Sequence, residues 1–148
     1  MLNKIIAIDF DGTIVEHRYP EIGKPIPFAI DILIRLREER HTLILWTVRE
    51  GALLQEAIDY CAAKGVIFYA HNANFPEEET TRASRKLTAD LFIDDRNLGG
   101  LPDWTAIYRA ISAMRHGSQD IIPILYGQPN LAAKKQRRGF FAALFGDN

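Results

Sequence analysis

The chain has little cysteine, almost no net charge and no long apolar run, and each of these shortages excludes a class of protein. It has one cysteine, Cys61, so no internal disulfide can form. The net charge of −1 over 148 residues gives no electrostatic support for binding of nucleic acid or a membrane by the whole chain. No apolar run approaches the length of a membrane span and no signal-peptide pattern opens the sequence, so we expect a cytoplasmic protein.

Apolar residues are plentiful and lie in short segments. A hydrophobic content of 47% and a charged content of 25% are ordinary for a soluble globular protein, and 148 residues are enough for one core. Apolar runs that favour strands alternate with apolar residues at helical spacing. We expect strands over 4–9, 43–46, 66–70 and 91–93, and helices over 28–36, 54–62 and 104–114. This alternation predicts a single-domain, Rossmann-like α/β fold, with a mainly parallel sheet and helices on both faces.

Two shorter elements are expected between and after these segments. Asn74 and Glu77 have the spacing of a capping box, so we expect a short helix that begins at Asn74 and carries Lys86. Pro123 lacks the amide hydrogen that an inner strand needs, so residues 121–126 are expected to form an edge strand at best.

The end of the chain differs in composition from the rest. Residues 127–148 contain four basic residues and one acidic residue, and a group of aromatic residues follows the basic ones. We therefore divide the chain into a main domain over 1–117 and an extension over 118–148. We expect the extension to be partly disordered or packed on the domain, and its contact with a membrane surface or a protein partner stays open.

Polar residues follow three of the four expected strands. The first strand leads into Asp9 and Asp11, the second ends at Thr47, and the fourth ends in Asp94 and Asp95. Because the carboxyl ends of parallel strands meet at one edge of a sheet, we expect these residues to share a site. Carboxylates this close need a cation or a reacting phosphate to offset their charge. The set contains the nucleophile, the acid and the cation ligands that phosphoryl transfer requires.

The motifs and their order are similar to those of a known family. The sequences DFDGT at 9–13, LILWT at 43–47 and LFIDD at 91–95, with a lysine shortly before the last, resemble the haloacid dehalogenase (HAD) superfamily of phosphohydrolases. The resemblance covers residues 4–115 and is greatest to small bacterial members without a cap domain. It implies an HAD-like fold and a Mg²⁺-dependent phosphatase that hydrolyses phosphate monoesters.

The resemblance also implies catalytic roles. Asp9 would be the nucleophile that forms an aspartyl-phosphate, and Asp11 the general acid that protonates the leaving group and then activates water. Thr47 would bind a phosphoryl oxygen, and Lys86 would neutralise the phosphate. The alternatives to that lysine are two neighbouring arginines, Arg82 and Arg85.

A metal site is implied by the same resemblance. Mg²⁺ would be held by Asp94 and Asp95, together with the carboxylate of Asp9 and the backbone carbonyl of Asp11. Oxygen ligands without Cys or His fit Mg²⁺ rather than Zn²⁺. We favour Asp94 as the direct ligand and Asp95 as a ligand through water, although which of the two contacts the metal stays open.

The spacing between the motifs leaves no room for a folded cap domain. We therefore expect a phosphorylated substrate that can be large, with the loop over 16–24 as a partial lid. Arg49 and Arg96 each follow a motif. Each could bind a second substrate anion or be a solvated surface arginine, and both alternatives stay open.

Two other functions stay open. A nucleotidase or nucleic-acid-end phosphatase would need an aromatic side chain near the site for base stacking, and Tyr19 and Trp46 are the candidates. The alternative from another class is a non-catalytic module that binds phosphate or a protein partner. A response-regulator receiver is disfavoured, because its phosphorylated Asp follows the third strand, and the expected third strand here leads into His71.

Overall fold

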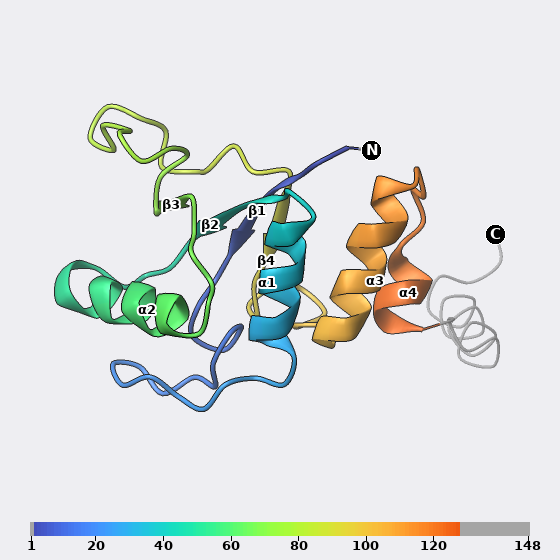
Figure 1. The fold of residues 1–148 in the computed structure, drawn as a ribbon, viewed down its shortest axis with the longest axis horizontal. Helices are drawn as coiled ribbons and strands as arrows, with labels where there is room; N and C mark the ends of the chain where they lie inside the picture. The colour runs from blue at the N-terminus through green and yellow to red at the C-terminus, as the bar shows by residue number, and fades with distance from the viewer. Residues whose placement is uncertain (1, 128–148) are drawn as a thin grey trace, which may run out of the picture.

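The computed structural model describes residues 2–127 and contains a four-stranded parallel sheet (Figure 1). The strands are β1 (Ile5–Ile8), β2 (Thr42–Leu45), β3 (Ala70–His71) and β4 (Leu91–Ile93), in the spatial order β3-β2-β1-β4. The helices are α1 (Ala29–Glu38), α2 (Gly51–Ala63), α3 (Trp104–Arg115) and α4 (Ile122–Tyr126). The predicted α/β class with a parallel sheet is therefore confirmed. Almost all of the basic and aromatic tail, residues 128–148, lies outside the described residues.

The two faces of the sheet are covered differently. Alternate strand residues such as Ile6 and Ile8 pack into one core with the buried side chains of α1, α2 and α3. On the other face, Ala7 and Ile44 form a small cluster with Leu87, which lies on the segment between β3 and β4. Within the described chain, the helices α1 to α3 thus share one core, and the prediction of helices on both faces is wrong.

The ends of α1 and α3 follow from local chemistry. The Asp103 carboxylate accepts hydrogen bonds from the amides of Thr105 and Ala106, so it is the N-cap that the sequence predicted for α3. Helix α1 begins at Ala29, directly after Phe28, whose φ of 65° is not helical.

Strand β3 is shorter and later than the predicted strand over 66–70. The amide of Val66 donates to the carbonyl of Cys61 and so helps to end α2. Pairing with β2 starts only where the amide of Tyr69 donates to the carbonyl of Leu43, 2.8 Å away. Because the amide of Val66 is used by the helix end, the strand cannot begin there.

The helix predicted from Asn74 does not form. The carboxylate of Glu78, rather than that of Glu77, accepts hydrogen bonds from the backbone and side-chain amides of Asn74. The side-chain oxygen of Asn74 in turn accepts from the amide and hydroxyl of Thr88. These contacts close a loop across the segment, so Asn74 is used for tertiary contacts instead of a helix start.

The predicted edge strand over 121–126 is instead the helix α4, which packs beside α3 (Figure 1). Pro123 lies in the first turn of α4, where a missing amide hydrogen costs no helical bond. The missing amide hydrogen of Pro123, which excludes an inner strand, is therefore equally compatible with the start of a helix.

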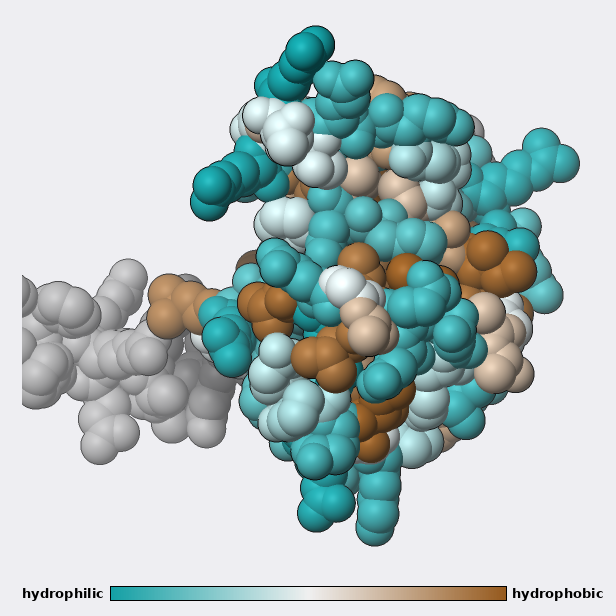
Figure 2. Space-filling model, turned by 90° about the vertical axis from the view of Figure 1, so that its left-hand side faces the viewer, coloured by the Kyte–Doolittle hydropathy of each residue, from teal (hydrophilic) through white to brown (hydrophobic). Residues whose placement is uncertain are grey.

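The surface seen from the α2 side carries apolar residues in small groups among polar ones (Figure 2). Such a mixture is ordinary for a surface in contact with water. Over residues 2–127, none of the helices is at once long enough and apolar enough to cross a membrane.

Candidate active site

Three carboxylates meet where β1 and β4 end. Ile8 of β1 pairs with Ile93 of β4, so the next residues, Asp9 and Asp94, leave the sheet side by side. One carboxylate oxygen each from Asp9, Asp94 and Asp95 lies within 4.8 Å of the others. The parallel sheet thus brings together residues that are far apart in the sequence, as expected from the strand ends.

Thr13 joins the two strand ends. Its buried hydroxyl donates to Oδ2 of Asp9 and accepts from the amide of Asp95, with both hydrogen bonds 3.0 Å long. Its carbonyl accepts from Nε1 of Trp104 at 2.9 Å. Thr13 is the last residue of the DFDGT motif, and its position there did not by itself indicate a role in the site.

Gly12 makes room for the carboxylate of Asp95. A Cβ atom at position 12 would lie 2.2 Å from Oδ2 of Asp95, and the φ of Gly12 is +85°. Only glycine combines this backbone conformation with so close an approach.

The three carboxylates fit a divalent cation. Burial raises the pKa of Asp9 to about 7, and the negative charge of Asp94 also raises it, although the hydrogen bond from Thr13 acts in the opposite direction. Oδ1 of Asp95 is buried and has no hydrogen-bond partner among the described residues. A bound cation would offset the repulsion and give this oxygen a partner, and oxygen ligands alone favour Mg²⁺.

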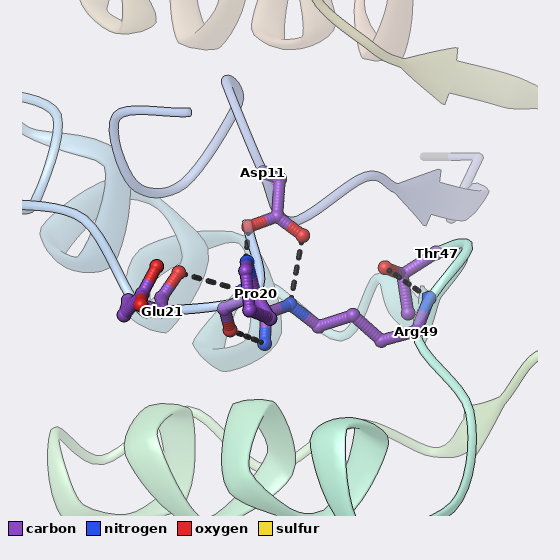
Figure 3. A network of polar contacts seen from close by, with 5 residues as sticks. All are labelled: Asp11, Pro20, Glu21, Thr47 and Arg49. Carbon is purple, nitrogen blue, oxygen red and sulfur yellow. Dashed lines mark hydrogen bonds and ion pairs between the residues drawn. The ribbon is translucent and has the colours of Figure 1, made fainter. Parts of the chain in front are cut away.

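Asp11 lies next to this group but points to Arg49 (Figure 3). Nε of Arg49 lies 2.7 Å from Oδ2 of Asp11, and Nη2 lies 2.7 Å from Oδ1. Both side chains are buried. Arg49 is therefore not a surface arginine, and its guanidinium is already occupied by a carboxylate rather than open to a substrate anion.

A cleft of about 70 Å³ opens beside the carboxylates. Its lining residues come from the strand ends, the loop 16–24 and the segment after β2: Asp9, Asp11, Asp94, His17, Tyr19, Val48 and Arg96. The loop proposed as a partial lid thus does contribute to the cleft.

Arg96 is the arginine that lines this cleft. Its amide donates to Oδ1 of Asp94 at 2.8 Å, which fixes its backbone beside the carboxylates. The side chain is exposed, so Arg96 can contact an anion without losing a buried partner.

The two residues expected to bind phosphate do not line the cleft. The hydroxyl of Thr47 accepts from the amide of Arg49 at 3.2 Å, and the amide of Thr47 donates to Oδ1 of Asn72 at 2.8 Å. Lys86 is exposed, with its ammonium 6.0 Å from the ring centre of Phe92. It lies on the segment that enters β4, whereas the cleft lies where β4 ends. Their phosphate-binding roles stay predictions.

The alternatives to Lys86 do not line the cleft either. Arg82 pairs with Glu79 at 3.4 Å, and Arg85 is exposed on the same segment.

Cys61 belongs to the core and not to the site. It is fully buried, and burial raises the pKa of its thiol to about 12. A buried thiol with a raised pKa is a poor nucleophile.

Comparisons with known proteins give one relative. No protein-family model matches the chain, and no curated protein matches it. Among solved structures, it is similar to the conserved protein coded by a locus of Bacteroides thetaiotaomicron, with 55% sequence identity and a TM-score of 0.77. The match covers 86% of this chain and 100% of that chain.

The contact between Gly12 and Asp95 predicts the effect of a Gly12→Ala substitution. The added methyl group would displace the Asp95 carboxylate, so we expect Mg²⁺ affinity to fall about 10-fold or more. Calorimetric titration with Mg²⁺ measures this affinity, and thermal unfolding shows whether the variant is folded. Gly117→Ala is the matched control, because Gly117 has a φ of +90° and no other group within 4 Å of a Cβ atom. Wild-type Mg²⁺ affinity in folded Gly12→Ala protein would contradict this account.

The raised pKa of Asp9 predicts how stability depends on pH without metal. Between about pH 4 and pH 7 the unfolded chain loses the Asp9 proton while the folded protein keeps it, so the free energy of unfolding falls as pH rises. An Asp9→Asn variant lacks this loss. Its Tm, measured in chelator relative to wild type, should therefore be higher at pH 8 than at pH 5. Asp59→Asn, a change at an exposed carboxylate on α2, serves as the control. The prediction is refuted if the difference in Tm between Asp9→Asn and wild type is the same at pH 5 and at pH 8.

Proposed function

The chain belongs to the same family as the conserved Bacteroides thetaiotaomicron protein, and we propose that it is a Mg²⁺-dependent phosphatase that acts through an aspartyl-phosphate on Asp9. The observation that carries the proposal is the convergence of Asp9, Asp94 and Asp95 beside a cleft that Asp11 also lines. Three carboxylates held this close are costly for the metal-free fold, so a role for the cluster in function explains it better than a role in stability. The HAD-like order of the motifs supports the same reaction.

The position of each carboxylate supports a distinct task in the reaction. Oδ2 of Asp9 is held by Thr13, which leaves Oδ1 to attack phosphorus. Asp11 must enter this step protonated, and as the P–O bond to the leaving group breaks it gives that proton to the leaving oxygen. Asp11 then takes a proton from the water that attacks the aspartyl-phosphate, and phosphate leaves with Asp9 restored.

The cation ligands would be the carboxylates of Asp9, Asp94 and Asp95. Bound Mg²⁺ supplies positive charge that offsets the charge on the phosphoryl oxygens. Arg96, which lines the cleft and has an exposed side chain, would add positive charge on the side of the substrate.

The shape of the cleft favours substrates whose organic part lies outside it. Two of the residues that line the cleft, Tyr19 and Val48, are 46% and 73% exposed, so the cleft is open to solvent on their side. A leaving group of any size can then extend past them. This supports the expectation of a phosphate ester that can be large.

A nucleotide or a phosphorylated nucleic-acid end is the second candidate substrate. Tyr19 lines the cleft and is 46% exposed, so a base could stack on its ring, whereas Trp46 packs on the sheet with Ala7 and Ile44. The observation therefore favours Tyr19 over Trp46 as the base-stacking residue.

Phosphate release from a panel of esters tests the main proposal. The panel holds sugar phosphates, nucleotides, phosphorylated oligonucleotides and an aryl phosphate, each with Mg²⁺ and with chelator. We expect Mg²⁺-dependent release that falls on the order of 10³-fold or more in Asp9→Asn, because the nucleophile is lost. Asp59→Asn should keep wild-type activity. Folded wild-type protein that binds Mg²⁺ but releases no phosphate from any ester would favour the non-catalytic alternative.

Tyr19→Leu separates nucleotide substrates from other esters. Removal of the ring should raise KM about 10-fold for nucleoside monophosphates, since base stacking on an aromatic side chain is worth about 1–3 kcal/mol. KM for a sugar phosphate should stay near the wild-type value. A similar rise in KM for all esters would show that Tyr19 does not recognise a base.

A further inference from the structure

We propose that Arg49 is a positioning residue that fixes the Asp11 carboxylate and the loop 16–24 together. The loop is then a fixed wall of the cleft rather than a lid that opens. The part of this inference that concerns Asp11 in catalysis depends on the proposed phosphatase function, whereas the part that concerns the loop does not.

Arg49 connects the loop and Asp11 directly. Besides its two bonds to Asp11, its Nη1 donates to the carbonyl of Pro20 at 2.9 Å and its Nη2 donates to the carbonyl of Glu21 at 3.0 Å (Figure 3). The side chain is fully buried. Each of its three nitrogens is thus used, and the planar guanidinium fixes these partners relative to one another.

Two aromatic rings hold the guanidinium from its sides. Its central carbon lies 5.1 Å from the ring centre of Phe10 and 5.4 Å from that of Tyr19. Phe10 lies between the two motif aspartates, and Tyr19 belongs to the loop. The arginine therefore contacts the motif and the loop through both hydrogen bonds and packing.

The base of the loop is closed as well. The amide of Glu16 donates to the carbonyl of Lys24 at 2.7 Å, and Val15 pairs with Pro25. A Cβ atom at Gly23 would lie 2.0 Å from the carbonyl oxygen of Glu16, so the two arms of the loop are in direct contact. With its base closed and its tip bound by Arg49, the loop has no free hinge within 16–24.

The backbone of Arg49 is held from the side of the sheet. Its amide donates to the hydroxyl of Thr47, and its carbonyl accepts from Nδ2 of Asn72 at 3.3 Å. Thr47 and Asn72 follow β2 and β3. Arg49 is thus fixed to these strand ends by its backbone and to Asp11 and the loop by its side chain.

The pair leaves Asp11 able to exchange a proton. Arg49 donates once to each oxygen of Asp11, and a carboxylate has about four lone-pair sites, so each oxygen keeps one site for a substrate or water. What the pair fixes is the orientation of the carboxylate toward the cleft that it shares with Asp9.

The test compares Arg49→Lys with wild type in two measurements. Lysine keeps the positive charge but lacks the planar fork, so it cannot hold Asp11 and both loop carbonyls. We expect kcat for phosphate release to fall about 10- to 100-fold with KM little changed, because a small misplacement of a catalytic group is costly. We also expect trypsin to cleave the folded protein after Arg18, in the loop, on the order of 10-fold faster. The matched control is Arg115→Lys, a change in another arginine–carboxylate pair, with Glu39.

A double variant shows whether Arg49 acts through Asp11. If it does, Asp11→Asn combined with Arg49→Lys should lose no more kcat than Asp11→Asn alone, within about twofold. Multiplied losses would overturn the positioning role. Wild-type kcat and wild-type cleavage in folded Arg49→Lys protein would overturn the whole inference.

The loop can be tested even where no ester is hydrolysed or Arg49→Lys does not fold. In the first case the phosphatase proposal fails alone, and the rate of cleavage after Arg18 still decides between a wall and a lid. In the second case Asp11→Leu combined with Arg49→Met removes both charges and leaves no buried charge unpaired. Faster cleavage after Arg18 in this variant supports the inference, and an unchanged rate overturns it.

Discussion

The repulsion between the carboxylates of Asp9, Asp94 and Asp95 is the constraint on which the rest of the site depends. The parallel pairing of β1 with β4 brings the three groups together, and partial burial then raises the pKa of Asp9 to about 7. The protein holds them in place with Thr13, which bonds to both strand ends. Gly12 contributes because it has no side chain, since a Cβ atom there would occupy the position of the Asp95 carboxylate. Such a cluster is most stable with a cation bound to it.

A fourth carboxylate, Asp11, is kept apart from this cluster by a buried arginine. Its charge is matched by Arg49, so it adds little repulsion to the other three, and its orientation is set by two short hydrogen bonds. The site thus has two electrostatic parts: a group of carboxylates suited to a cation, and a neutral pair suited to hold one carboxylate beside the cleft. In the proposed reaction, a bound cation would favour the ionised form of Asp9 that attacks phosphorus, and Arg49 would hold Asp11 in place for its proton transfers.

The sequence predicted the parts that local signals and strand order decide. β1, β4 and α3 were close to their predicted positions, and the approach of Asp9 to Asp94 and Asp95 followed from the parallel sheet alone. The failures came from long-range contacts: Asn74 bonds across a loop to Thr88, and Val66 ends a helix instead of starting a strand. The role of Arg49 could not be read from its position after a motif, because its burial depends on Asp11 and on carbonyls of a loop far away in the sequence.

The most direct test of the central claim is a crystal structure of the protein with Mg²⁺ and beryllium trifluoride, a mimic of a phosphoryl group bound to aspartate. The account predicts beryllium trifluoride on Oδ1 of Asp9, with Mg²⁺ bound by the carboxylates of Asp9, Asp94 and Asp95. A structure in which the metal binds elsewhere, or in which Asp9 stays unmodified while Mg²⁺ occupies the site, would contradict the account.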